Sequence, residues 1–214
     1  VVVDGQLWQR PAGRALFDVL DTDVPGLPQP ERSFRISQTT QKRFSQVLNI
    51  FRTIIKVDID PTQYTQTKMK FTRDVYARPQ VVLTIQSPNE KDFAAFVKKN
   101  SRSIIDFLVK GEMNRQINEL EEKHSEAVSQ LAEEIFKCQL WAPAEIKSYK
   151  KGKDFFWASS NTASGLVNIC MYSYPYEGPR TFNKQYVLAK RDSVMKANIP
   201  GTEPRMYMAT DTLC

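Results

Sequence analysis

A continuous helical periodicity over residues 101–137 constrains this chain more than any other feature. Apolar side chains recur there at steps of three to five residues, while glutamates fall on the other faces. At about 1.5 Å per residue, a single helix of this length would be roughly 55 Å long, which is more than the width of a compact domain. We therefore expect a long amphipathic helix with a bend or break near Gly111. The apolar stripe consists of Ile104, Leu108, Met113, Ile117, Leu120, His124, Ala127, Leu131 and Ile135.

The only histidine of the chain, His124, belongs to this stripe. A catalytic or metal-binding histidine needs a carboxylate or a second ligand within reach, and its helical neighbours Leu120, Ala127 and Val128 supply neither. The position predicts an imidazole packed in a hydrophobic seam, and a polar functional site at His124 is the alternative. The sequence therefore favours binding over catalysis.

The remaining candidates for metal or redox chemistry are sparse. The three cysteines are widely spaced, which indicates no disulfide framework and no zinc site and leaves one disulfide or none. Asp58 and Asp60 alternate at the end of a predicted strand, but no third oxygen ligand follows them at a calcium-loop spacing. We expect no bound metal and no cofactor.

The charge balance is that of a mixed surface, with 30 Lys and Arg against 24 Asp and Glu. Basic residues do not alternate with aromatic residues along any nucleic-acid-binding module, so we expect no nucleic-acid partner. No run of about 18 apolar residues is present either. The first residues contain neither a methionine nor a basic and apolar leader, and we expect that a preceding segment has been removed.

The order of predicted elements indicates an α+β protein. We expect a mixed, largely antiparallel sheet that is covered by the long amphipathic helix and several shorter helices. The length of 214 residues suits a single domain, 1–214, or two packed halves, 1–138 and 139–214. Predicted strands are 33–38, 51–59, 67–76, 80–86, 146–150, 154–160 and 166–174, and Thr181 is the expected cap of a last helix.

Aromatic residues on two predicted strands form the best candidate binding site. Trp157 lies on one strand, and Tyr172, Tyr174 and Tyr176 follow with a period of two on or just beyond the next. Rings on one sheet face provide a flat amphipathic surface for a sugar or a protein partner. The same pattern is also typical of a stripe packed beneath a helix, and the degree of ring exposure distinguishes the two.

Several longer strings resemble an uncharacterised Bacteroidetes cell-envelope lipoprotein family, a domain of unknown function. The resemblance implies export, acylation of a cysteine that precedes Val1, and attachment to the cell envelope on its periplasmic or extracellular face. It also implies that family members extend beyond Cys214, so that this chain is a fragment. The strings are 7–8, 11–16, 24–30, 57–61, 72–80, 112–116, 156–161, 172–176 and 189–194.

We therefore expect a lipid-anchored envelope protein with a binding or structural role and an unknown envelope protein or glycan as its partner. Contact with the membrane is expected only through an N-terminal lipid anchor outside this chain. A glycan-binding module that uses the aromatic strands is the first alternative. A hydrolase of envelope polymers centred on His124 is the second.

Overall fold

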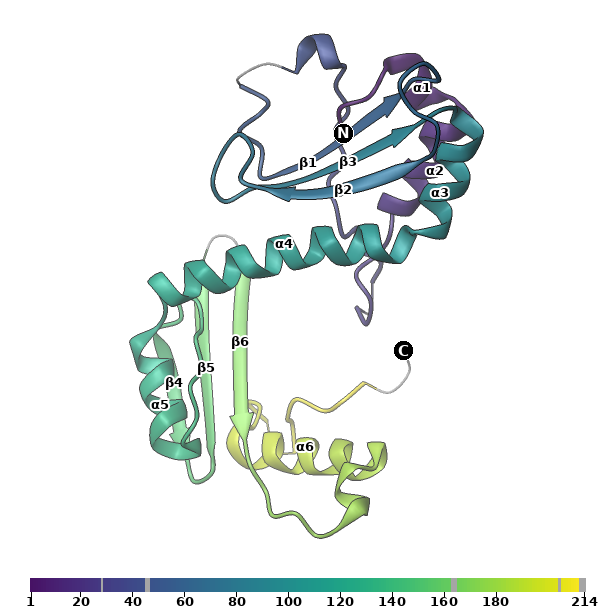
Figure 1. Cartoon of the computed structure of the whole chain (residues 1–214). Coiled ribbons are helices and arrows are strands. Elements are labelled where there is room, and N and C mark those ends of the chain that lie inside the picture. Colours follow the sequence, from purple (N-terminus) through teal and green to yellow (C-terminus); the bar gives the residue numbers. More distant parts are fainter. Residues whose placement is uncertain (28, 45–46, 163–164, 204, 212–214) are drawn as a thin grey trace. The chain divides into compact units, whose positions relative to one another are not determined.

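The structure is a computed structural model that describes residues 1–27, 29–44, 47–162, 165–203 and 205–211, without the side chains of residues 161 and 162. The chain forms two compact units, Val1–Gln116 and Ile117–Cys214. The units meet between residues 116 and 117, whereas the halves expected from the sequence meet between residues 138 and 139. The packing of two halves against each other stays a prediction. Both units combine helices with a three-stranded sheet, which confirms the α+β class (Figure 1).

The sheet of the N-terminal unit has the order β1-β3-β2. Its strands are β1 (Thr53–Ile59), β2 (Lys68–Arg73) and β3 (Val81–Ser87). The central strand β3 is parallel to β1 and antiparallel to β2. The first residues extend the sheet beyond β1, because Val2 N donates to Ile55 O at 2.7 Å. The strand expected at 33–38 is wrong, since that segment forms no strand and the chain makes a single bridge from Thr39 to Val2.

Helices cover one face of this sheet. They are α1 (Gly5–Gln9), α2 (Pro11–Leu20), α3 (Glu90–Lys99) and α4 (Ser101–Glu122), and a short helix η1 (Gln41–Arg43) precedes β1. Asp4 and Asn89 accept hydrogen bonds from backbone N–H groups in the first turns of α1 and α3, which explains where both helices begin. The main core contains Leu7, Trp8, Leu16, Ile55, Leu83, Ile85, Phe93, Val97, Ile104 and Leu108.

Helix α4 continues through Gly111, so the break expected at this glycine is wrong. A Cβ atom on residue 111 would lie 2.7 Å from Cγ1 of Val81 at the start of β3. Real Cβ atoms do not approach a neighbour this closely. Gly111 therefore allows the helix to pass close to the sheet and does not interrupt it.

The long helix ends instead at Glu122, and α5 (Glu126–Phe136) begins after a break of three residues. Ser125 starts the new helix, because its hydroxyl accepts a hydrogen bond from Val128 N. The break is fixed by the neighbouring segment, since Ser125 N donates to Ala142 O at 2.8 Å and its hydroxyl donates to Ile146 O at 2.6 Å. A break in the helical run is therefore present, but at residues 123–125 and not near Gly111.

The C-terminal unit contains an antiparallel sheet of order β4-β5-β6. Its elements are β4 (Ser148–Gly152), β5 (Phe155–Thr162), β6 (Gly165–Tyr172), η2 (Pro179–Phe182) and α6 (Lys184–Asn198). Helix α5 packs on one face of this sheet. Its core contains Val128, Leu131, Ala132, Ala142, Ile146, Phe156 and Ala158.

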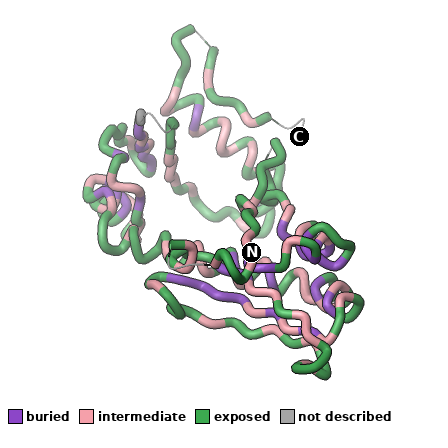
Figure 2. Tube along the Cα trace, turned by 90° about the horizontal axis from the view of Figure 1, so that it is seen from above, coloured by how far each residue is buried: buried purple, intermediate pink, exposed green. Residues whose placement is uncertain are grey.

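The last helix begins later than the sequence predicts. Asn183 is its cap, because the side chain accepts a hydrogen bond from Gln185 N, whereas the buried Thr181 accepts one from Glu177 N. Buried positions follow the central strands and the inner helix faces of each unit (Figure 2). Within the described ranges, no helix has both the length and the apolar character needed to cross a bilayer.

Gly13 provides a test of the close packing between α1 and α2. A Cβ atom on residue 13 would collide with the backbone, 2.5 Å from Cα of Trp8. We expect Gly13→Ala to lower the free energy of unfolding by about 1–3 kcal/mol, because backbone atoms must move. Gly5→Ala is the matched control, since a Cβ on residue 5 meets nothing within 4 Å. Urea denaturation followed by circular dichroism measures both, and equal stabilities of the two variants would contradict the expected clash.

Candidate functional site

The register of the second sheet places two of the four predicted aromatic residues on one face. Trp157 is opposite Cys170, and Phe155 is opposite Tyr172. Residues that are directly opposite each other in an antiparallel pair share a face, so Trp157 and Tyr172 both lie on the face that does not contact α5. Tyr174 and Tyr176 follow the end of β6.

The rings of Tyr172 and Tyr174 are largely covered by other side chains. Tyr174 stacks on Tyr172 with ring centroids 6.2 Å apart and contacts Tyr186 of α6 at 6.0 Å. The ammonium of Lys190 lies 5.8 Å from the Tyr174 ring centroid and 5.4 Å from that of Tyr186, which are cation–π distances. These side chains form a closed cluster and not an open platform.

Trp157 is also partly engaged within the sheet. Its indole Nε1 donates a hydrogen bond to Oδ1 of Asn168 on β6 at 2.9 Å, and the side chain is half-buried. The polar handle of the ring is therefore already satisfied. The continuous platform of Trp157, Tyr172, Tyr174 and Tyr176, one of the two arrangements that the sequence allows, is not formed as one open surface.

Tyr176 and Phe182 remain open to solvent. Tyr176 is 63% exposed and Phe182 is 78% exposed, and their ring centroids are 5.6 Å apart. The loop that carries Tyr176 is tied to α6 and η2, because the hydroxyl of Tyr186 donates to Glu177 and Glu177 N donates to Thr181 Oγ1. We call Tyr174, Tyr176, Phe182, Tyr186 and Lys190 the aromatic surface.

Sequence reasoning missed three members of this aromatic surface. Tyr186 and Lys190 are four residues apart on one helix, a spacing at which side chains contact each other, and this spacing was available as a signal. Phe182 carried no comparable signal. Its ring meets Tyr176 only because the loop between β6 and η2 folds back.

A polar network connects α6 to the end of the described chain. Asp192 Oδ1 accepts hydrogen bonds from the hydroxyl of Thr210 at 2.6 Å and from the Thr210 backbone N–H at 3.0 Å. It also accepts one from Arg191 at 3.0 Å. These hydrogen bonds, led by the Thr210 hydroxyl, lower the pKa of Asp192 below its ordinary value of 3.8.

Burial acts in the opposite direction on the β6 side chains near this network. Desolvation raises the pKa of the Cys170 thiol and of the Tyr172 hydroxyl, and nearby Arg191 offsets part of each shift. Cys170 is a free thiol, as is Cys138, which packs against the core on the α5 side of the sheet. The possible disulfide between these two residues is therefore not formed.

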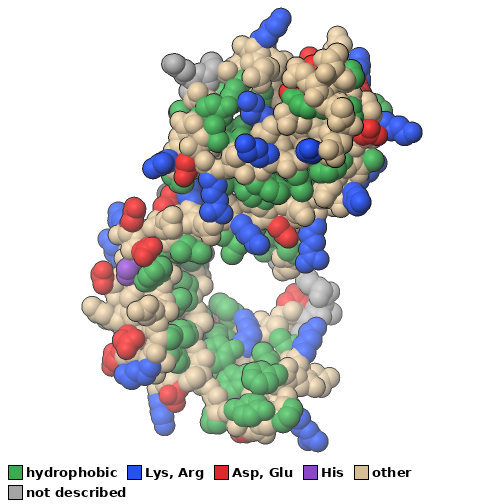
Figure 3. Space-filling model, viewed as in Figure 1, with side chains coloured by type: hydrophobic (Ala, Val, Ile, Leu, Met, Phe, Trp, Pro, Cys, Tyr) green, Lys and Arg blue, Asp and Glu red, His purple; other side chains and the backbone are tan. Residues whose placement is uncertain are grey.

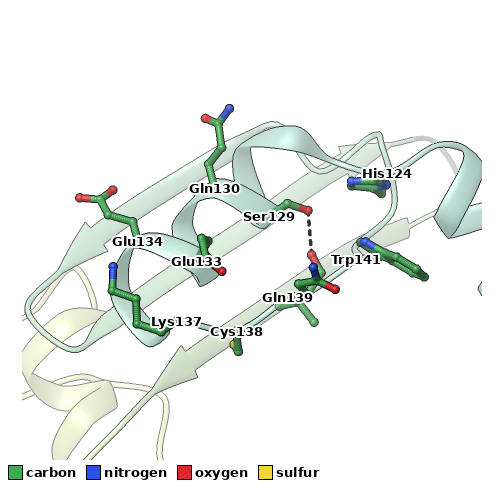
Figure 4. Close-up of a pocket in the computed structure, with 10 residues that line it drawn as sticks. His124, Ser129, Gln130, Glu133, Glu134, Lys137, Cys138, Gln139 and Trp141 are labelled. Atoms are coloured by element: carbon green, nitrogen blue, oxygen red, sulfur yellow. Dashed lines mark hydrogen bonds between the residues drawn. The ribbon is translucent and has the colours of Figure 1, made fainter.

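The second candidate site is an open groove of about 610 Å³ along α5, lined by side chains from His124 to Trp141. His124 and Trp141 lie at one end, and Glu134 and Lys137 lie at the other, with Ser129 between them (Figure 4). The Ser129 hydroxyl donates to Leu140 O at 2.9 Å.

His124 is in the break between α4 and α5 and not on a helix stripe. Its Nδ1 donates to the carbonyl of Leu120 at 2.8 Å, and its ring stacks on Trp141 with centroids 5.9 Å apart. The half-buried histidine is visible at the surface in Figure 3. The imidazole therefore caps the last turn of α4 and lines the groove. The prediction that His124 is packed within a hydrophobic seam of one helix is therefore wrong.

The acidic candidates form hydrogen bonds within a turn. Asp60 accepts from the N–H and hydroxyl of Thr62, and these bonds lower the pKa of its carboxyl. Asp58 accepts from the hydroxyl of Tyr64 at 2.5 Å, and this bond raises the pKa of that phenol. In the part of the chain that the structure describes, no group of three His, Cys, Asp or Glu is placed to hold a metal ion.

The fold and the site thus define a two-unit α+β protein with a surface aromatic cluster and no recognised catalytic constellation among the described residues. Residues 1–121 match the family described as Domain of unknown function (DUF8532), and the chain belongs to this family. Residues 124–214 match a second one, Domain of unknown function (DUF4837). No curated protein and no solved structure matches the chain. The expectation of an uncharacterised family is confirmed.

The Asp192 network gives a prediction for the pH dependence of the C-terminal segment. Because the pKa of Asp192 is lowered in the folded state, its contribution is present above pH 3.8 and is lost as pH falls through that lowered value. We expect Thr210→Val to shift the pKa of Asp192 upward, since the hydroxyl donor is removed. Thr210→Ser retains the hydroxyl and should leave the pKa low. Carboxyl titration by NMR measures the shift, and identical titrations in both variants would refute the assignment.

Proposed function

We propose that this protein is a non-catalytic binding protein that contacts a protein partner through the aromatic surface. The observation that carries the proposal is the exposure of the paired rings of Tyr176 and Phe182, since the loop that carries Tyr176 is joined by hydrogen bonds to η2, which carries Phe182, and to α6. Exposed aromatic side chains held in a fixed position lose little conformational entropy on binding, and such residues dominate the energetics of protein interfaces.

The cover over Tyr172 and Tyr174 supports a protein partner more than a glycan. A sugar stacks on open ring faces, but Tyr174 lies between Tyr172 and Tyr186 and also meets Lys190. Phe182, the most exposed ring, has no hydroxyl with which to bond a sugar. A protein side chain needs only the exposed edge and face of the Tyr176 and Phe182 pair.

The contacts of His124 support a non-catalytic role. Its Nδ1 donates to the Leu120 carbonyl and its ring stacks on Trp141, and both contacts hold the ring in place. The Leu120 carbonyl holds the ring, but among the contacts of His124 in the described residues there is neither a carboxylate nor a nucleophilic side chain with which it could form a catalytic pair. A hydrolase of envelope polymers remains the least supported of the three hypotheses.

The proposed location is the cell envelope of a Bacteroidetes bacterium. The protein would be a lipoprotein, held by an N-terminal lipid anchor outside the 214 residues and facing the periplasm or the exterior. The resemblance of many strings along the chain to an envelope lipoprotein family supports this location. The proposed partner is an envelope protein, and the proposed function requires neither a cofactor nor nucleic acid.

Site-specific photo-crosslinking in the native host tests the protein-partner proposal. We expect a benzophenone side chain at residue 182 to give a discrete crosslinked product, because this position is at the proposed contact. The addition of Tyr176→Ala should weaken that product several-fold, since the neighbouring ring is removed. Tyr149 is an exposed tyrosine on β4 and provides the matched control position. If the probe at position 149 gave the same crosslinked product as the probe at position 182, a specific contact at the aromatic surface would be refuted.

Glycan binding is the second candidate function and rests on the same exposed pair of rings. A screen against soluble envelope glycans, with Tyr149→Ala as a control, would detect it. We expect no glycan to lose binding on Tyr176→Ala, because one open tyrosine beside a phenylalanine is a small platform. A glycan that binds the unchanged chain and is lost with Tyr176→Ala would replace the protein-partner proposal.

A further inference from the structure

The N-terminal unit carries the whole net charge of the chain. Residues 1–116 contain 18 Lys and Arg and 12 Asp and Glu, whereas residues 117–214 contain 12 of each. The excess is concentrated in two segments. Residues 40–56 and 68–80 together contain eight basic residues and one acidic residue, Asp74. This charge is therefore a local feature of one part of the fold.

These two segments meet at one end of the β1-β3-β2 sheet. The chain enters β1 and β3 at this end, and β2 leaves it there, because β1 and β3 are parallel and β2 is antiparallel (Figure 1). The loop before β1 and the loop between β2 and β3 are therefore neighbours. The ring of Phe44 in the first loop contacts the ring of Tyr76 in the second, with centroids 5.6 Å apart.

The buried side chain of Gln80 joins the two loops. Its Nε2 donates to Asn49 O at 2.6 Å and to Phe51 O at 2.8 Å, while its Oε1 accepts from Tyr76 N at 3.0 Å. All of these bonds are between a polar side chain and backbone groups that would otherwise need water. These hydrogen bonds join residues 49–51 of the first loop to Tyr76 and Gln80 of the second, so that the joined parts form one tip of the sheet.

Large apolar side chains point outward from this tip. Val47 is 74% exposed, Ile50 is 63% exposed and Phe51 is 59% exposed, and Val75 and Tyr76 in the second loop are exposed as well. Such a group of exposed apolar residues within two short loops marks an interaction surface. We call these five residues the apolar tip.

Basic residues occupy the same two loops as the apolar tip, or the elements next to them. Lys42, Arg43, Arg73 and Arg78 are exposed, and in the described part of the chain none of them forms an ion pair. Arg52 is close enough to Glu112 to lower the pKa of that carboxyl, after the stronger effect of Arg115. The single acid of the loops, Asp74, accepts a hydrogen bond from Gln80 N. Lys and Arg side chains are visible around this end of the unit in Figure 3.

We propose that the apolar tip and its basic rim dock on the surface of a bilayer that contains anionic lipids. Apolar side chains that enter the boundary between headgroups and acyl chains, flanked by cations that meet lipid phosphates, define this mode of binding. A bilayer is preferred to a purely polyanionic partner such as nucleic acid, because a phosphate backbone offers no apolar surface for the exposed Val47, Ile50 and Phe51 to contact. The proposal adds a second membrane contact to the lipid anchor and does not depend on it.

Cosedimentation with vesicles tests the proposal on the whole 214-residue chain. We expect binding to vesicles of phosphatidylcholine and phosphatidylglycerol at a 3:1 ratio, and much weaker binding to phosphatidylcholine alone. Each basic residue near an anionic surface contributes about fivefold in affinity, so the double variant Lys42→Glu, Arg43→Glu should bind at least about tenfold more weakly. Binding should also weaken with added salt, because salt screens the charges.

A second pair of variants separates a bilayer from other anionic partners. Ile50→Ser together with Phe51→Ser keeps every charge and should lower vesicle binding at least about tenfold, since the apolar tip is removed. Lys147→Glu with Lys153→Glu is the charge-matched control in the C-terminal unit and should bind as the unchanged chain does. Circular dichroism verifies that each variant is folded.

Two results would overturn the proposal. The first is that the unchanged chain does not bind the anionic vesicles. The second is that the Ile50→Ser, Phe51→Ser variant binds them as strongly as the unchanged chain, which would identify the basic rim alone as a site for a soluble polyanion.

Discussion

The segment between α4 and α5 is the constraint on which the C-terminal unit depends. Residues 123–125 separate the two helices. Their hydrogen bonds are with the ends of α4 and α5 and with the loop that follows α5. His124 Nδ1 bonds a carbonyl in the last turn of α4, and Ser125 both caps α5 and bonds the carbonyls of Ala142 and Ile146. These bonds satisfy polar groups that a helix end leaves without partners. They fix the direction of α5 and bring Trp141 against the imidazole.

Different helices pack on the two faces of the C-terminal sheet. Helix α5 buries Phe156 and Ala158 on one face. On the other face, Lys150 of β4 donates to Asn198 O at the end of α6 at 2.6 Å, and Tyr186 of the same helix reaches Tyr174. Helix α6 therefore decides which aromatic rings are covered. Tyr176, in the loop after β6, and Phe182, at the end of η2, lie outside this cover, and their rings are exposed.

The chemistry of the two units is distinct. The N-terminal unit combines a net positive charge with exposed apolar loops, while the C-terminal unit is neutral and presents aromatic rings. The matches to two different families divide the chain between residues 121 and 124, at the end of α4. A membrane contact in one unit and a partner contact in the other are compatible with this division, because each surface is built entirely from residues of its own unit.

The sequence by itself determined the α+β class, the approximate position of six of the seven predicted strands, and the helical character of residues 101–137 on both sides of the break. These features follow from local periodicity and from caps such as Asn89. The Ser125-Glu126 pair was also a local signal for a new helix, but the apolar spacing continued through it and hid the break. Only the tertiary structure decided that Gly111 is a close-approach site, that β1 is parallel to β3, and that α6 covers Tyr174. Each of these depends on residues far apart in the chain, and a local pattern contains no information on which distant side chain will fill the space beside it.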